Sequence, residues 1–147
     1  MRRAIGIGLV FALVLSAASA RAQGLSNLAG TYKLVSGEKG DSEIPRNRLD
    51  GVVRITPDTM TLHDKDNNEV YVIQYSIDRA AEPARIMMTV TRSSRSESVG
   101  SRARGLIKAQ GKQLTLIYDY KGSDYPSDFH PKGDTQHLFV MERTDEK

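Results

Sequence analysis

The feature that most constrains the fold is a series of eight short runs rich in β-branched and aromatic residues. They cover residues 31–36, 52–56, 59–63, 69–77, 85–91, 105–109, 113–120 and 137–143. Each run has the length and the bounding turn residues of a β-strand. No long stretch of helical periodicity interrupts them, and the chain ends four residues after the last run. A series of short strands of this kind favours a closed barrel or a sandwich.

The first strand begins with Leu28-Ala29-Gly30-Thr31-Tyr32. A Gly-x-aromatic element at the start of about eight strands is typical of small β-barrels that hold ligands. We therefore predict an all-β fold, an eight-stranded, mostly antiparallel up-and-down barrel with no C-terminal helix. Its interior is expected to use alternate residues of each strand, either the following set or the residues that alternate with them: Leu34, Ile55, Leu62, Val72, Met88, Leu106, Leu116 and Val140.

The first 22 residues have the layout of a secretory signal peptide. Arg2 and Arg3 precede an uncharged apolar segment over 4–16, and small-x-small sites end at Ala20 and Ala22. The apolar segment is shorter than the ~20 residues that span a bilayer. We therefore expect cleavage near Ala20 or Ala22 and export to the periplasm or the exterior. The mature domain would cover 23–147 and would have no membrane span.

The excess of basic over acidic residues in the full chain comes from this leader. Loss of Arg2, Arg3 and Arg21 leaves 18 basic and 18 acidic side chains, so the formal charge of +3 disappears. A neutral domain lacks the electrostatic footprint of a nucleic-acid-binding protein, and we predict no nucleic-acid partner. The chain has no cysteine, so the domain must be held by its core alone. At this length one core is sufficient, and we expect a monomer.

Residues 79–112 carry a local charge asymmetry, with eight basic and two acidic side chains. A long connection over 92–104 contains Arg92, Arg95, Arg102 and Arg104 among five serines. One hypothesis is an anion-collecting rim formed by these four arginines. The other is a solvated hairpin tip, since such a composition cannot bury itself.

A second long connection, over 121–136, lies beside an aromatic group. Tyr120 and Tyr125 are candidate rim residues for a ligand-stacking mouth, together with Tyr118 and Phe129. The alternative is ordinary packing of strand aromatics. A third connection, over 37–50, is a candidate lid.

The sequence contains no arrangement of residues that is typical of a catalytic site. His63, His130 and His137 lack the spacing of metal ligands. The polar turn over 64–69 resembles the start of a calcium loop, but Glu69 replaces its glycine and Tyr75 its terminal glutamate. We predict no metal, no cofactor and no enzymatic activity.

Several elements together resemble a family of small exported bacterial domains that are lipocalin-like and of unknown function. The family's Leu-x-Gly-x-Trp element corresponds to the segment from Leu28 to Tyr32. A later glycine and leucine pattern corresponds to Gly105, Gly111, Leu114 and Leu116. Pro-x-x-Phe corresponds to Pro126 and Phe129, and the closing arginine to Arg143. The chain departs from the family pattern at Tyr32, Ile107 and Tyr125.

The resemblance implies a structural closure of one barrel end by Gly30, Tyr32 and Arg143. In lipocalin-like barrels the opening aromatic packs against an arginine of the last strand, so Arg143 is expected over the Tyr32 ring. The family brings no biochemical activity. We therefore expect a non-enzymatic barrel that binds a small apolar or amphipathic ligand. The alternative is an interaction module whose filled barrel presents the basic loop to an anionic glycan or protein.

Overall fold

The computed structural model describes residues 25, 27–121 and 123–144, and it confirms the predicted barrel. The predicted signal peptide and its cleavage sites lie outside these residues. The strands are β1 (Gly30–Lys39), β2 (Ser42–Glu43), β3 (Val52–Ile55), β4 (Thr59–His63), β5 (Glu69–Asp78), β6 (Arg85–Ser93), β7 (Arg102–Gln110), β8 (Gln113–Asp119) and β9 (Gln136–Arg143). Two single-turn 3-10 helices, η1 (Arg46–Arg48) and η2 (Ser96–Ser98), lie in connections. Among the described helices, none is long and apolar enough to cross a membrane.

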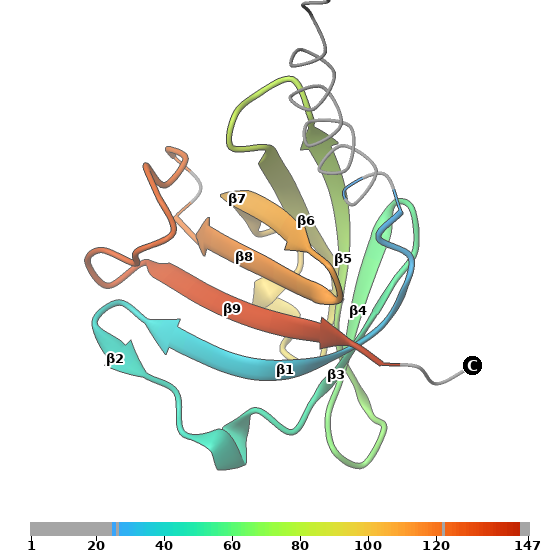
Figure 1. Cartoon of the computed structure of the whole chain (residues 1–147). Helices are drawn as coiled ribbons and strands as arrows, with labels where there is room; N and C mark the ends of the chain where they lie inside the picture. Colours follow the sequence, from blue (N-terminus) through green and yellow to red (C-terminus); the bar gives the residue numbers. More distant parts are fainter. Residues whose placement is uncertain (1–24, 26, 122, 145–147) are drawn as a thin grey trace, which may run out of the picture.

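Eight of these strands form a closed, antiparallel, up-and-down barrel (Figure 1). Each strand pairs with its neighbours in the order β1-β3-β4-β5-β6-β7-β8-β9, and β9 pairs with β1 to close it. The short β2 forms a hairpin on the end of β1. Closure leaves these eight strands without free edges, which are the usual liability of a sheet.

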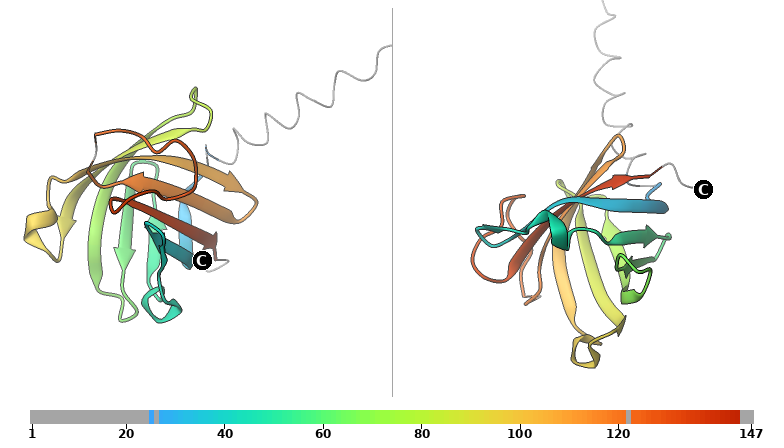
Figure 2. Two further views of the ribbon diagram at one scale, coloured as in Figure 1. Left: turned by 90° about the vertical axis from the view of Figure 1, so that its left-hand side faces the viewer. Right: turned by 90° about the horizontal axis from the view of Figure 1, so that it is seen from below.

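The predicted connection over 92–104 is shorter than expected. β6 continues to Ser93 and β7 begins at Arg102, so the connection is limited to residues 94–101. Arg92, Arg102 and Arg104 therefore lie on strands and only Arg95 lies in the connection. Serine and arginine are tolerated in a strand whose outer face meets solvent, and composition alone does not mark the boundary. The β6–β7 hairpin, yellow in Figure 2, projects beyond one end of the barrel.

The interior follows the pleat of the strands. Leu34, Leu62, Met88 and Leu116 face inward, and Ile55 belongs to the buried core. For three strands the alternate residues are inside, and the named ones lie on the outer face: Val72, Leu106 and Val140. Their inward-facing neighbours are Tyr71, Ile107 and Phe139. These strands are apolar on both faces, so alternation alone does not fix which set is inside.

One end of the barrel is closed by the predicted pair. The Arg143 guanidinium carbon lies 5.4 Å from the centre of the Tyr32 ring, and its Nη2 donates to the Tyr32 hydroxyl at 2.9 Å. The same nitrogen donates to the Asn27 carbonyl at 2.6 Å, while the Tyr32 hydroxyl donates to the Leu28 carbonyl at 2.8 Å. The predicted contact is therefore present, and hydrogen bonds to the hydroxyl add to the cation–ring contact.

Gly30 lies beside the Arg143 side chain in this arrangement. Its φ of +153° lies in a region that side chains rarely adopt. A Cβ at this position would lie 3.4 Å from Nε of Arg143. The opening signature therefore places a glycine beneath the arginine that closes the barrel.

A second apolar layer lies outside the barrel. Ile117 and Leu106 pair across β8 and β7 on the outer face, yet they are 0% and 3% exposed. The β8–β9 connection covers this face (Figure 2, left), with Arg104 donating to the Ser123 carbonyl at 3.2 Å. Pro126 in the same connection is buried.

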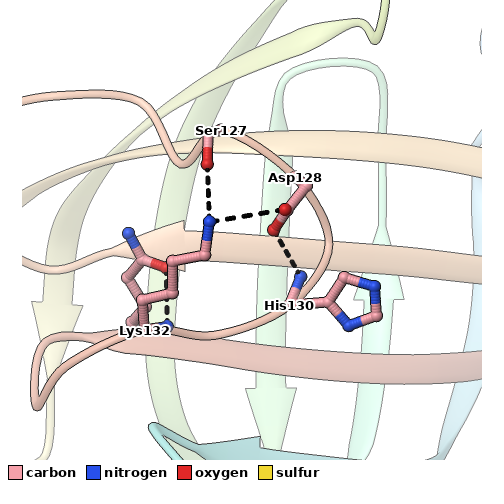
Figure 3. Close-up of polar contacts among 5 residues, drawn as sticks. Ser127, Asp128, His130 and Lys132 are labelled. Atoms are coloured by element: carbon pink, nitrogen blue, oxygen red, sulfur yellow. Dashed lines mark hydrogen bonds and ion pairs between the residues drawn. The ribbon is translucent and has the colours of Figure 1, made fainter.

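Polar contacts within the β8–β9 connection hold its shape (Figure 3). Lys132 Nζ donates to Ser127 Oγ at 3.0 Å and lies 3.4 Å from Asp128 Oδ2. The His130 backbone N–H donates to Asp128 Oδ1 at 3.0 Å. That N–H and then the Lys132 ammonium lower the pKa of the Asp128 carboxyl below its usual range. The connection is thus a structural cover for β7 and β8.

Candidate functional site

The barrel is hollow toward the end opposite the Tyr32–Arg143 pair. The cavity has a volume of about 610 Å³, within the range of small-molecule sites. Its deepest lining residues also belong to the buried core: Val53, Met60, Met88, Leu116 and Met141. Three methionines in this floor are suited to an adaptable apolar surface, because their side chains are unbranched and polarizable.

The mouth of the cavity carries the polar groups. Arg95, Ser98 and Ser101 come from the β6–β7 hairpin, Arg102 begins β7, and Lys39 ends β1. Backbone hydrogen bonds fix this hairpin, with Val90 donating to the Ser101 carbonyl at 2.9 Å and Gly100 to the Val90 carbonyl at 2.8 Å. The hairpin thus places polar side chains above the apolar floor.

The structure separates the six candidate rim residues into two groups. Arg95, Arg102 and Tyr120 line the cavity. Arg92, Arg104 and Tyr125 do not. Arg92 forms an ion pair with Glu69 at 2.8 Å, between two exposed side chains. Tyr125 lies on the outer face, with the guanidinium carbons of Arg85 and Arg104 at 4.6 and 5.6 Å from its ring centre.

Two β-bulges change which residues reach the mouth, and the sequence pattern did not reveal them. On β6, the register passes from Val90 directly to Arg92 opposite β5, so Thr91 is the extra residue. Strict alternation would turn Arg92 inward with Val90. The extra residue instead turns Arg92 outward toward Glu69.

The bulge on β1 has the larger consequence for the cavity. Leu34 pairs with Met141 and Ser36 with Val140, so Val35 is the extra residue. Strict alternation from Leu34 would place Glu38 on the inner face. After the bulge, Lys39 lies opposite His137 and lines the cavity in its place.

An aromatic wall flanks the mouth on β8 and β9. The Tyr118 hydroxyl lies 3.2 Å from His137 Nδ1, and the Tyr120 and His137 ring centres are 5.2 Å apart. Phe139 stacks on Tyr118 at 6.2 Å. Burial raises the pKa of the Tyr118 phenol above its usual range, so this group stays neutral. Tyr120 remains 47% exposed at the edge of the wall.

The connection between β1 and β3, proposed from sequence as a lid, contains β2 and η1. The Ile44 and Phe139 side chains both lie on the side of Gly37 where a Cβ would point. The Ile44 backbone N–H donates to the Gly37 carbonyl at 2.8 Å. Of residues 37–50, only Lys39, at the end of β1, lines the cavity, so the role of this segment as a lid stays a prediction.

His137 should make stability depend on pH. Burial is the main cause that lowers its pKa, and the charge of Lys39 adds to it, while Asp119 opposes both. The unfolded chain, with an ordinary histidine pKa of ~6.5, then binds a proton more readily than the folded one. The stabilising contribution is complete above that value and is lost as the pH falls toward the lower folded pKa.

We therefore expect the urea midpoint to fall between about pH 7.5 and 5.5. His137→Gln should remove part of this dependence, whereas His130→Gln, at an exposed position of the β8–β9 connection, should not. An identical pH profile in wild type and His137→Gln would contradict the assignment.

The described residues hold no group of three or more histidine, cysteine or acidic side chains arranged to bind a metal ion. Comparison with protein-family models, curated proteins and solved structures gives no match. The candidate site is therefore defined by its own geometry: an apolar cavity with a polar mouth at one end of a barrel closed at the other.

Proposed function

We propose that this barrel binds a small apolar or amphipathic molecule in the cavity between the β6–β7 hairpin and the Met60–Met88–Met141 floor. The observation that carries the proposal is the cavity of about 610 Å³, whose floor is apolar and whose mouth is polar. At about 30 Å³ for a group the size of water, this volume accommodates roughly twenty such groups. A single acyl chain or a compact ring system has this size.

The same observations favour binding over catalysis. The surface offered to a ligand is aliphatic and aromatic, which gives affinity through desolvation rather than through chemistry. The hypothesis of an interaction module required a filled barrel, and the cavity favours the binding hypothesis instead. We also propose that the chain is a lipocalin-like domain exported after cleavage near Ala20 or Ala22, on the strength of its signature and leader.

A cavity-filling variant tests this function. Ala103 faces inward on β7 opposite Met88 and lines the cavity. Ala103→Trp should weaken the binding of a lipophilic fluorescent dye at least about tenfold, because the indole occupies the space that the ligand needs. Fluorescence titration of the purified barrel measures the dissociation constant.

The matched control is Met87→Trp, which adds the same indole to the adjacent strand on its outer face. Met87 is 37% exposed and pairs with Arg104, away from the cavity. It should bind the dye as the wild type does, and thermal melts check that both variants fold. Equal affinity in Ala103→Trp and Met87→Trp would overturn the proposed site.

A further inference from the structure

The charged side chains that line the cavity all have the same sign. Within the described part of the chain they are Lys39, Arg95 and Arg102, and no carboxylate accompanies them. A random choice of charged residues would favour a mixture of both signs, because the domain from residue 23 onward has equal numbers of basic and acidic side chains. The mouth is therefore a local cationic field on a neutral domain, and a cleft with one sign of charge attracts the opposite ion.

A backbone bulge contributes to the positive charge at the mouth. The bulge at Val35 replaces Glu38 by Lys39 on the inner face of β1. Glu38 instead pairs with Leu138 and with Glu43 of the short β2 hairpin. Without that one extra residue, the mouth would present a carboxylate where it now presents an ammonium group.

The three cationic residues that line the cavity come from separate segments of the chain. Lys39 ends β1, Arg95 lies in the β6–β7 connection and Arg102 begins β7. Neither Arg95 nor Arg102 has a carboxylate partner among the described ion pairs, which involve Arg92 and Lys132. The Arg95 guanidinium, in the connection, can therefore donate to an incoming anion, while Arg102 adds positive charge at the rim beside the inward-facing Ala103. Charge-assisted bonds of this kind are stronger than neutral ones.

We infer that the ligand is a single-chain anionic amphiphile, with its acid group among Lys39, Arg95 and Arg102 and its chain along the methionine floor. This inference rests on the proposed function and adds the sign of the head group and the number of chains. The cavity volume suits one chain, whereas a two-chain phospholipid needs more room. A free fatty acid and a membrane lysolipid share this chemistry.

The experiment compares three amphiphiles with the same chain by isothermal titration calorimetry below their micellar concentrations. Dodecanoate is anionic, dodecanol is neutral and dodecyltrimethylammonium is cationic. Dodecanoate should bind about tenfold more tightly than the other two, as expected for two or three partly screened ion pairs. The preference should weaken as salt is raised. Lysophosphatidic acid in solution and phosphatidylglycerol vesicles separate the free ligand from a membrane source.

The double variant Arg95→Gln/Arg102→Gln should bind all three chains with similar affinity. The control Lys65→Gln/Arg92→Gln makes the same change in net charge at exposed positions outside the cavity. It should keep the preference for dodecanoate.

Equal binding of dodecanoate and dodecanol to the wild type would overturn the inference about charge and leave the cavity function intact. A preference that survives Arg95→Gln/Arg102→Gln would also overturn it, because the cations would then not be the cause. Binding to phosphatidylglycerol vesicles alone would contradict a single-chain ligand. Failure of all three chains to bind would overturn the proposed function itself.

Discussion

Ile117→Ala should lower the free energy of unfolding by about 3–4 kcal/mol, because truncating a fully buried aliphatic side chain to alanine costs roughly 2–5 kcal/mol. Ile117 lies on the outer face of β8, where an ordinary barrel residue would meet solvent, yet it is 0% exposed. The β8–β9 connection covers it, so the truncation leaves a cavity between strand and cover. Urea denaturation monitored by circular dichroism measures the change.

The control for this prediction is Met87→Ala, a truncation on the same outer face at a position that the cover does not bury. It should cost less than about 1 kcal/mol, as surface substitutions do. If Ile117→Ala costs no more than Met87→Ala, the β8–β9 connection is not part of the folded core. Dye binding should persist in the folded fraction of both variants, because the cavity lies on the inner face.

Arg143→Met should destabilise the barrel by about 2–3 kcal/mol, because it removes charged hydrogen bonds from two partners, one of which belongs to the buried Tyr32 side chain. Those partners are the Tyr32 hydroxyl at 2.9 Å and the Asn27 carbonyl at 2.6 Å. Methionine keeps the apolar stem of the arginine, so the loss reports the guanidinium rather than packing. Thermal and urea unfolding measure it.

A double-mutant cycle with Tyr32→Phe isolates the contact itself. The coupling between Arg143→Met and Tyr32→Phe should be about 1–2 kcal/mol, the size of one charged hydrogen bond plus a cation–ring contact. Arg92→Met breaks an exposed ion pair and should cost less than about 1 kcal/mol. Additive effects of the two closure substitutions would contradict the closure that the opening signature predicts. The affinity for the dye should be unchanged, because the cavity opens at the other end.

The fold could be predicted from the sequence because the signals for strands are local. Alternation and turn residues predicted all eight barrel strands, and the resemblance predicted the contact between Tyr32 and Arg143. The inner face was harder, because strands that are apolar on both sides carry no alternation. The sequence therefore left two alternating sets open, and the structure places Val72, Leu106 and Val140 on the outer face.

The mouth of the cavity could not be predicted in full from the sequence. A bulge adds one residue to a strand, so every side chain after it points to the opposite face. Neither Val35 nor Thr91 is a residue type that marks a bulge in a sequence. That is why Lys39 was missed. Arg92 was included among the rim residues because the segment over 92–104 was predicted as a connection, whereas β6 continues to Ser93. Arg104 and Tyr125 were included because both lie near the basic segment and the aromatic group in sequence, whereas the outer layer takes them away from the cavity.

Methionine methyl groups give the most direct test of the proposed cavity. Met60, Met88 and Met141 line it, while Met87 points outward from the same barrel. In a sample with ¹³C-labelled methionine methyls, bound dodecanoate should show nuclear Overhauser effects to the three cavity methyls and none to Met87. Saturating dodecanoate that shows no contact with those three methyls, or contact with Met87 alone, would contradict an interior binding site.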